Sequence, residues 1–259
     1  MNQGENSGAG TALEDTIWQA RFLHFDRVQP HVPAMSLRPY AMPMHRFGMR
    51  RTWKYYPFLK QSIDIVFALV GLIVAMPLMI LIAIAIKLDS PGPVLFRQKR
   101  IGKNRRYHSN GHLKERRRWD LKGKPFVIYK FRTMRADADP YAISPSDDGD
   151  PRLTRVGRVI RSLCLDELPQ LINVLKGDMS LVGPRPEMPF IVQKYNMIES
   201  LRLLVKPGIT GLWQLHGSRK KHIHENLHYD LEYIQKCCLL MDLKILVKTL
   251  GFVLKTKNV

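Results

Sequence analysis

The amino-acid sequence predicts a small, mostly helical α/β domain that is attached to a membrane. Three observations lead to this fold class. A run of 22 uncharged residues, Ile65–Ile86, is long enough to enter or cross a bilayer. A segment rich in β-branched and aromatic residues, Pro125–Phe131, is typical of a strand. Two later stretches, which begin near Gly157 and Leu239, carry apolar residues at helical spacing.

Length and composition limit the class of protein. With 259 residues, 45% of them hydrophobic, the chain can bury a core, and fibrous or low-complexity classes are excluded. The formal net charge of +19 predicts anionic partners, which could be nucleic acid, phosphorylated metabolites or an acidic membrane surface. The three cysteines, two of them adjacent, cannot form a disulfide framework and fit a reducing compartment.

The first 54 residues are predicted to form a poorly ordered tail. Gly, Pro, Met and His are frequent there, and the segment has no clear hydrophobic periodicity. It also lacks a basic region followed by an apolar one, so no cleaved signal peptide is expected.

Residues 55–90 contain the predicted membrane helix, with Pro77 near its centre. Basic residues flank the uncharged run on both sides, and the positive-inside rule places such flanks in the cytoplasm. A straight crossing would move one flank outside, whereas a helix broken at Met76–Pro77 keeps both inside. The arm before the proline has about 12 apolar residues, roughly 18 Å of helix, and is too short to cross. A re-entrant helix is therefore favoured over a spanning one, and a buried helix of a soluble core is the third alternative.

Two later segments are candidates for contact with lipid. The basic, turn-rich stretch within Tyr107–Gly123 is either a solvated loop or a contact for anionic headgroups. The segment Leu239–Lys257 alternates apolar positions with lysines at helical spacing, which predicts an amphipathic helix. We favour an interfacial position for this helix over packing on the core.

An adjacent pair of carboxylates, Asp166 and Glu167, lies at the start of a predicted helix. Apolar residues at Leu168, Leu171, Ile172 and Leu175 form its stripe, and Gly177 suits its end. Most Asp-Glu pairs at such positions only interact favourably with the helix dipole.

The arginines around this pair favour a functional role. Arg161 precedes the carboxylates, and Arg185 follows in a stiff Gly-Pro-Arg-Pro turn. Acidic groups beside arginines suit a site that handles phosphate with a divalent cation. One carboxylate can act as a nucleophile, and the other can hold Mg²⁺. The alternating carboxylates within 147–150 suggest calcium, but the closing Glu of the twelve-residue calcium loop is missing.

The sequence resembles the bacterial sugar transferase family, the monotopic polyprenyl-phosphate phosphoglycosyl transferases. The matching motifs run in family order over about residues 58–255. They are PGPVLFRQKRIG (91–102), IYKFRTM (128–134), DPRLTRVGRVIR (150–161), RSLCLDELPQLINVLKGDMSLVGPRPE (161–187), KPGITGLWQLHG (206–217) and DLKILVKTL (242–250).

The resemblance implies a catalytic domain over residues 91–259, on the cytoplasmic face of the bacterial inner membrane. Its implied reaction moves a sugar 1-phosphate from a nucleoside diphosphate sugar, expected to be a UDP-sugar, to polyprenyl (undecaprenyl) phosphate. UMP would be released, and exopolysaccharide or other glycoconjugate assembly would begin.

The family motif also implies roles for individual residues. Asp166 matches the nucleophile that carries the sugar phosphate as an aspartyl intermediate, and Glu167 matches the Mg²⁺ ligand. The family's helix break falls on Met76-Pro77, where a serine commonly replaces the methionine. Positions that contact phosphate or shape the site match Lys130, Arg132, Arg161 and Arg185.

A second class of function accounts for the charge alone. A basic, membrane-anchored protein could bind nucleic acid or lipid headgroups without catalysis, but it leaves the ordered motifs unexplained. No helix-turn-helix, zinc-finger or aromatic RNA-binding pattern occurs, so we expect anionic lipids and no nucleic acid as partners. A kinase-like enzyme is disfavoured because no GxxxxGK[ST] loop is present. The choice of sugar and the oligomeric state stay open.

Overall fold

The computed structural model describes residues 56–104, 122–142, 145, 149–216 and 223–255. These residues belong to one compact unit that extends from Phe47 to Val259. The predicted N-terminal tail, residues 1–54, lies outside the described residues, as does most of the Tyr107–Gly123 segment.

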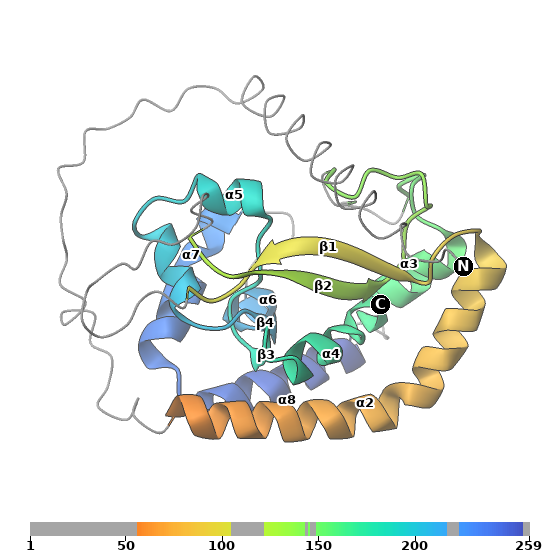
Figure 1. The fold of residues 1–259 in the computed structure, drawn as a ribbon. Coiled ribbons are helices and arrows are strands. Elements are labelled where there is room, and N and C mark those ends of the chain that lie inside the picture. The colour runs from red at the N-terminus through yellow and green to blue at the C-terminus, as the bar shows by residue number, and fades with distance from the viewer. Residues whose placement is uncertain (1–55, 105–121, 143–144, 146–148, 217–222, 256–259) are drawn as a thin grey trace, which may run out of the picture. The chain divides into compact units, whose positions relative to one another are not determined.

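Helix α2 (Tyr56–Asp89) contains the whole predicted membrane run. Its length and composition are sufficient to cross a bilayer. The helix does not end at Met76 but continues through Pro77, and it changes direction along its length (Figure 1). A proline inside a helix removes one backbone hydrogen bond and bends the axis. The predicted break is therefore a bend within one continuous helix.

Strands β1 (Leu95–Ile101) and β2 (Pro125–Phe131) form an antiparallel ribbon in which Leu95 pairs with Phe131. The bounds of β2 confirm the predicted strand. Its outer edge is satisfied by the buried side chain of Asn173, which donates to the Val127 carbonyl at 2.7 Å and accepts from the Tyr129 amide at 3.0 Å. One side chain thus replaces a neighbouring strand.

A second, very short sheet pairs β3 (Ser180–Val182) with β4 (Gly208–Thr210) in parallel. The two segments approach so closely that a Cβ atom at Gly183 would overlap the Lys206 carbonyl. Only glycine fits at such a position. The chain directly after β3 therefore has little freedom to move relative to β4.

Helices make up most of the remaining described residues, in agreement with the predicted mostly helical fold. The last of them confirms the helix predicted from Leu239. They are α3 (Arg155–Ser162), η3 (Leu165–Glu167), α4 (Gln170–Leu175), α5 (Pro189–Gln193), η4 (Glu199–Leu204), α6 (Leu212–His216), α7 (Ile223–Lys236) and α8 (Leu239–Lys255).

Both halves of α2 pack on this unit. Ala68 is fully buried in a core that includes Ile234 and Ile245 of α7 and α8. Ile82 and Ile86 are buried further along, in a cluster with Phe131 of β2. Because buried residues occur in both halves, the helix lies against the unit rather than extending away from it.

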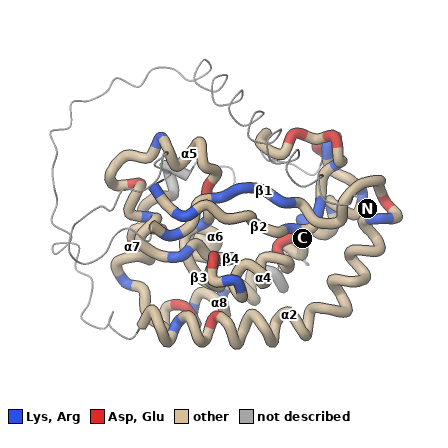
Figure 2. Tube along the Cα trace, viewed as in Figure 1, with Lys and Arg blue, Asp and Glu red and all other residues tan. Residues whose placement is uncertain are grey.

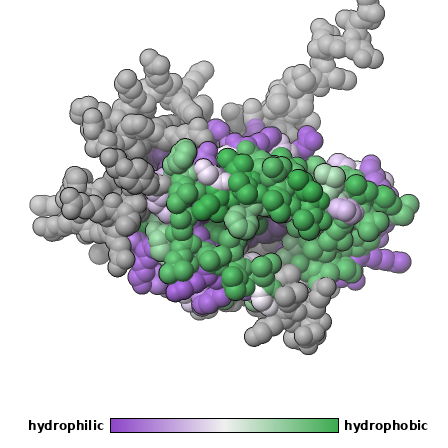
Figure 3. Space-filling model, turned by 90° about the horizontal axis from the view of Figure 1, so that it is seen from below, coloured by the Kyte–Doolittle hydropathy of each residue, from purple (hydrophilic) through white to green (hydrophobic). Residues whose placement is uncertain are grey.

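The opposite face of α2 is apolar and exposed. Between Asp64 and Lys87 the helix carries no charged residue, as Figure 2 shows. Viewed from below, hydrophobic residues dominate the surface (Figure 3). A contiguous apolar face of this kind marks an interaction or membrane surface in a folded protein. Its exposed members include Val66, Phe67, Val70, Ile73, Val74, Ile80, Leu81 and Ile84 of α2, and Leu240, Leu243, Val247 and Leu250 of α8.

Candidate active site

The two predicted catalytic carboxylates lie on η3, a single turn between α3 and α4. Cys164, with φ of 56°, reverses the chain after α3 and begins this turn. Leu165 and Leu168 pack in the cluster that contains Ile82 and Ile86 of α2. The turn that carries Asp166 and Glu167 therefore rests on the second half of the predicted membrane helix.

The helix after the carboxylates is shorter than the apolar spacing predicted. Of the expected stripe, Leu171 and Leu175 pack on the core. The most deeply buried positions are instead Gln170, Asn173 and Val174. Asn173 is buried because it completes the edge of β2, a long-range contact that periodicity does not report. Gly177, with φ of 74°, follows α4 as expected for a helix stop.

Lys130 of β2 brings a positive charge to both carboxylates. Its Nζ atom donates to Glu167 Oε1 at 2.6 Å and lies 3.9 Å from Asp166 Oδ2. Arg185 Nη1 approaches the same Glu167 oxygen at 3.6 Å. The two carboxylates thus differ. Glu167 is held by Lys130 and Arg185, whereas Asp166 accepts no hydrogen bond from the described residues and has only the 3.9 Å approach of Lys130.

Burial raises the pKa of the Asp166 carboxyl above its usual range. The positive charges of Lys130, Arg161 and Arg185 oppose this rise, and the adjacent negative charge of Glu167 adds to it. A carboxylate with a raised pKa is more basic, and it is a better nucleophile once ionised.

Arg185 is held in position from two sides. Its backbone carbonyl accepts a hydrogen bond from Arg202 Nη2 at 3.1 Å. Its guanidinium lies over the Trp213 ring of α6, 5.8 Å from the ring centroid. Arg202 in turn forms a buried ion pair with Asp230 of α7 at 2.7 Å and donates to the Tyr195 hydroxyl. The turn that presents Arg185 therefore rests on a buried polar network.

The remaining predicted phosphate contacts divide into two groups. Arg161 lies in the last turn of α3, donates to the Pro145 carbonyl at 3.0 Å, and its charge acts on Asp166. Arg132 is buried and donates to the Ser90 carbonyl at 2.8 Å and to the Pro91 carbonyl. The structure thus brings Arg161 toward the carboxylates but gives Arg132 a different task, which is to fix the chain after α2.

The carboxylate pair has the donor chemistry that Mg²⁺ requires. This ion is usually held by one or two carboxylates together with substrate phosphates, so the Glu167 carboxylate fits this chemistry without a larger cage. Among the described residues, no group of three or more His, Cys, Asp or Glu side chains could hold a metal. In the loop of residues 147–150, where the calcium-binding pattern is incomplete, Asp150 is hydrogen-bonded to Arg152, which lowers the pKa of its carboxyl to about 2. Asp147 and Asp148 lie outside the described residues.

We name the active-site cluster as Asp166, Glu167, Lys130, Arg161 and Arg185. Three cations surround two carboxylates, so the cluster can accept a further anion and bring it against a nucleophilic oxygen. Sequence reasoning missed the residues that hold Arg185. Trp213 lies within a quoted motif, but no local pattern pointed to the pairing of Arg202 with Asp230.

The chain is similar to known proteins over most of its length. The family model for bacterial sugar transferases matches residues 55–256. The chain is 40% identical over 205 residues to a UDP-N-acetylgalactosamine-undecaprenyl-phosphate N-acetylgalactosaminephosphotransferase of Aeromonas hydrophila, which covers 77% of this chain and 44% of the relative. It is also 40% identical over 237 residues to a UDP-glucose:undecaprenyl-phosphate glucose-1-phosphate transferase of Caulobacter vibrioides, covering 88% and 79%.

A third relative carries yet another sugar in its name. The undecaprenyl-phosphate galactose phosphotransferase of Salmonella typhimurium is 38% identical over 213 residues, covering 76% of this chain and 41% of the relative. The chain therefore spans less than half the length of two of these three relatives.

Proposed function

The chain belongs to the bacterial sugar transferase family, and from this premise we propose that it transfers a sugar 1-phosphate from a UDP-sugar to undecaprenyl phosphate. The observation that carries the proposal is the Asp166–Glu167 pair between Lys130 and Arg185. The relatives described above are named for three different sugars, so the proposal leaves the sugar unspecified.

In the first step, a carboxylate oxygen of Asp166 attacks the β-phosphorus of the UDP-sugar. The bond between this phosphorus and the bridging oxygen breaks, and UMP leaves with the electron pair. The product is an acyl phosphate that links Asp166 to the sugar phosphate. Lys130, Arg161 and Arg185 supply positive charge beside Asp166, where negative charge accumulates on the phosphate oxygens.

In the second step, a phosphate oxygen of undecaprenyl phosphate attacks the phosphorus of the intermediate. The bond to Asp166 breaks, the carboxylate is regenerated, and an undecaprenyl diphosphate sugar leaves. Two displacements at one phosphorus need one nucleophile and one shared set of cations, which the active-site cluster provides. Such a product would initiate exopolysaccharide or other glycoconjugate assembly.

Glu167 is the residue that would hold Mg²⁺. A bound Mg²⁺ ion would neutralise part of the diphosphate charge. Lys130 donates to Glu167 Oε1 at 2.6 Å. Lys130 therefore fixes the orientation of the Glu167 carboxylate and adds its own positive charge to the site. Asp166, which is less engaged by cations, is left as the nucleophile.

We also propose that α2 is re-entrant and that the unit lies on the cytoplasmic face of the inner membrane, against anionic lipids. Contacts at both ends of the helix support this topology. Lys60 near its start forms an ion pair with Asp242 of α8 at 3.0 Å. Asp89 at its end accepts from the Val156 amide of α3 at 2.9 Å. Contacts of both helix ends with one domain favour a position of the two ends on the same side of a bilayer.

Nucleotide release tests the proposed reaction. The full chain, purified in lipid nanodiscs, is incubated with a panel of UDP-sugars and undecaprenyl phosphate, and UMP is measured. We expect one sugar or a few to support UMP release that requires Asp166. Absence of UMP release with every UDP-sugar would refute the proposal and leave a basic binding protein as the alternative.

Replacement of Pro77 tests the topology. Pro77→Leu restores a straight helix, which should span the bilayer and move the N-terminal tail to the far side. Single cysteines near Asn6 and Asn258, in a chain without Cys164, Cys237 and Cys238, report accessibility to an impermeant thiol reagent in intact cells. We expect protection of both in the parent chain and labelling of the N-terminal site only after Pro77→Leu. Labelling of the N-terminal site in the parent chain would show a spanning helix.

A further inference from the structure

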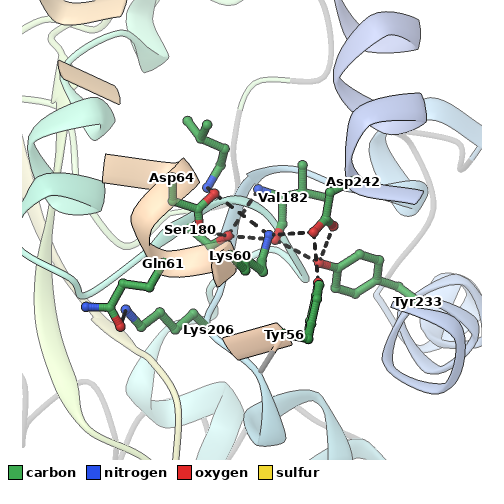
Figure 4. Close-up of polar contacts among 10 residues, drawn as sticks. Tyr56, Lys60, Gln61, Asp64, Ser180, Val182, Lys206, Tyr233 and Asp242 are labelled. Atoms are coloured by element: carbon green, nitrogen blue, oxygen red, sulfur yellow. Dashed lines mark hydrogen bonds and ion pairs between the residues drawn. The ribbon is translucent and has the colours of Figure 1, made fainter. Parts of the chain in front are cut away.

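A buried polar cluster joins the start of α2 to β3, the strand that leads to Arg185. We name it the α2 cluster, and Figure 4 shows how its members converge from four elements. Its members are Tyr56, Lys60 and Asp64 of α2, Ser180 of β3, Tyr233 of α7 and Asp242 of α8.

Asp64 bonds directly to β3. Its Oδ1 atom accepts from the Leu181 amide at 3.2 Å, and its Oδ2 atom accepts from the Ser180 hydroxyl at 2.7 Å. The other strand of the sheet, β4, pairs with Ser180 and Val182. The carboxylate of Asp64 therefore takes the place of a third strand for an element that is only three residues long.

Asp242 holds the same arrangement from the other side. It accepts from Tyr56 at 2.8 Å, from Lys60 at 3.0 Å and from Tyr233 at 2.8 Å. The Tyr233 hydroxyl also lies 3.1 Å from the Val182 carbonyl. Lys60 lies 3.8 Å from Asp64 as well, so one lysine links the two carboxylates.

The free-energy cost of burying the Asp64 carboxylate indicates that this cluster does more than fill space in the core. Asp64 is only 6% exposed, directly before a run of 22 uncharged residues. Burying a carboxylate is costly, and a well-packed apolar residue commonly serves stability as well or better. A carboxylate provides what an apolar side chain lacks, which is two directed acceptors for the backbone and side chain of β3.

Movement of β3 would reach the active site over a short path. Only Gly183 and Pro184 separate β3 from Arg185, and Gly183 donates to the Thr210 carbonyl at 2.9 Å. The Gly208 amide donates to the Pro184 carbonyl at 2.9 Å. These close contacts couple the turn of residues 183–185 to the sheet, so a shift of β3 displaces Arg185.

We propose that Asp64 is a positioning residue for sugar phosphate transfer: it fixes β3 and so keeps Arg185 beside Glu167, which makes the packing of α2 on the unit a condition for an assembled active site. The proposal rests on the proposed function for its effect on activity. Its structural part, the dependence of Arg185 on Asp64, can be measured independently.

Trp213 provides that independent measurement. The Arg185 guanidinium lies over its ring, so a displaced Arg185 changes the emission of this tryptophan. The chain has 4 tryptophans, and replacing Trp18, Trp53 and Trp119 with Phe leaves Trp213 as the only reporter. Arg185→Ala in this background defines the emission that corresponds to loss of the contact.

The experiment compares variants of Asp64 in nanodiscs. Asp64→Leu fills the volume but removes both acceptors, and it should shift Trp213 emission toward that of Arg185→Ala. It should also lower kcat/KM for the UDP-sugar on the order of a hundredfold, as expected for a displaced substrate-binding group. Asp64→Asn keeps an acceptor for the Leu181 amide and should restore most of both readouts. Gln61→Leu, a control on the same turn that contacts only Lys206 in Figure 4, should change neither.

A double-mutant cycle decides whether Asp64 acts through Arg185. If it does, adding Asp64→Leu to Arg185→Ala should lower kcat/KM by less than about a further twofold. Additive effects, or unchanged Trp213 emission in Asp64→Leu, would overturn the proposal. If Asp64→Leu does not fold, Ser180→Ala replaces it, with a smaller emission shift in the same direction expected and no shift contradicting the proposal. A parent chain that releases no UMP would refute the proposed function, while the emission measurement would still test the dependence of Arg185 on Asp64.

Discussion

Two clusters of charged side chains are linked by β3, and they are built in opposite ways. The α2 cluster contacts the strand itself, and the active-site cluster includes Arg185, which follows the strand. The active-site cluster has three cations and two carboxylates, and the Arg185 side chain is 35% exposed. The α2 cluster has one cation and two carboxylates, and the side chains of Lys60, Asp64 and Asp242 are 9–13% exposed. One has an excess of positive charge and an accessible arginine, and the other has neither.

Hydrogen bonding shows the same difference. Asp64 and Asp242 each accept at least two hydrogen bonds from groups on other elements. Asp166 has only the 3.9 Å approach of Lys130 among the described residues. A satisfied buried cluster rigidifies a fold, whereas an unsatisfied one beside excess positive charge is prepared for an anionic ligand. The comparison thus assigns stability and position to one cluster and chemistry to the other.

The largest expected effect is on activity alone, at Asp166. Asp166→Asn removes the nucleophilic oxygen but keeps the shape, so turnover should fall at least about a thousandfold. The unfolding midpoint and membrane association should stay near those of the parent chain. UMP release and thermal unfolding of the same preparation check both points. Near-normal turnover of the folded variant would exclude Asp166 as the nucleophile.

The next effect is on stability, at Asp242. Among the described residues, Asp242→Ala leaves Lys60 only the 3.8 Å approach to Asp64. It also removes an acceptor for the hydroxyls of the partly buried Tyr56 and the buried Tyr233. Breaking a buried pair in this way costs about 3–5 kcal/mol, which denaturant unfolding in detergent measures. Asp242→Asn is the matched control, because it retains an acceptor and should lose less. A loss below about 1 kcal/mol for Asp242→Ala would contradict the structural role of the α2 cluster.

A smaller effect is expected at the second active-site carboxylate. Glu167→Gln removes one charged oxygen ligand, so the rate should fall about 10- to 100-fold and half-maximal activity should require more Mg²⁺. A magnesium titration with each variant measures this shift. Asp150→Asn should leave the titration unchanged. If Asp150→Asn shifted the titration and Glu167→Gln did not, the metal would be assigned to the loop of residues 147–150.

The smallest effect is expected at a partly exposed ion pair outside both clusters. Lys124 and Asp178 are 2.8 Å apart, and the lysine side chain is 41% exposed. Asp178→Asn should change the free energy of unfolding by less than about 1 kcal/mol and leave turnover unaffected. A loss comparable with that of Asp242→Ala would show that distance alone, rather than burial and hydrogen bonding, determines the contribution of an ion pair here.

Local sequence patterns predicted the elements whose hydrophobic pattern is visible within a single stretch of sequence. The uncharged run gave α2, the β-branched segment gave β2, and lysines at helical spacing gave α8. Strand β1 was missed because its sequence, LFRQKRI, carries three charges that the ribbon accommodates. Strands β3 and β4 were missed because three residues are too few for any periodicity.

The residues of the candidate site also divide into those that a local motif identified and those that it did not. Asp166, Glu167 and Arg185 were found from a contiguous motif, and the structure brings them together with Lys130. Arg132 was grouped with them by sequence but is bound to carbonyls after α2. Asp64 was not singled out, although a carboxylate directly before an apolar run was a visible anomaly. Its partners, Ser180 and Leu181, are more than 110 residues away, and no local pattern reports such pairing.

The most direct test of the proposed mechanism is the mass of the protein after reaction with a UDP-sugar in the absence of undecaprenyl phosphate. We expect a covalent gain equal to one sugar phosphate, located on Asp166, absent in Asp166→Asn and discharged when undecaprenyl phosphate is added. Release of UMP without any covalent gain, or a gain located on another residue such as Glu167, would contradict the proposal that Asp166 carries the transferred group.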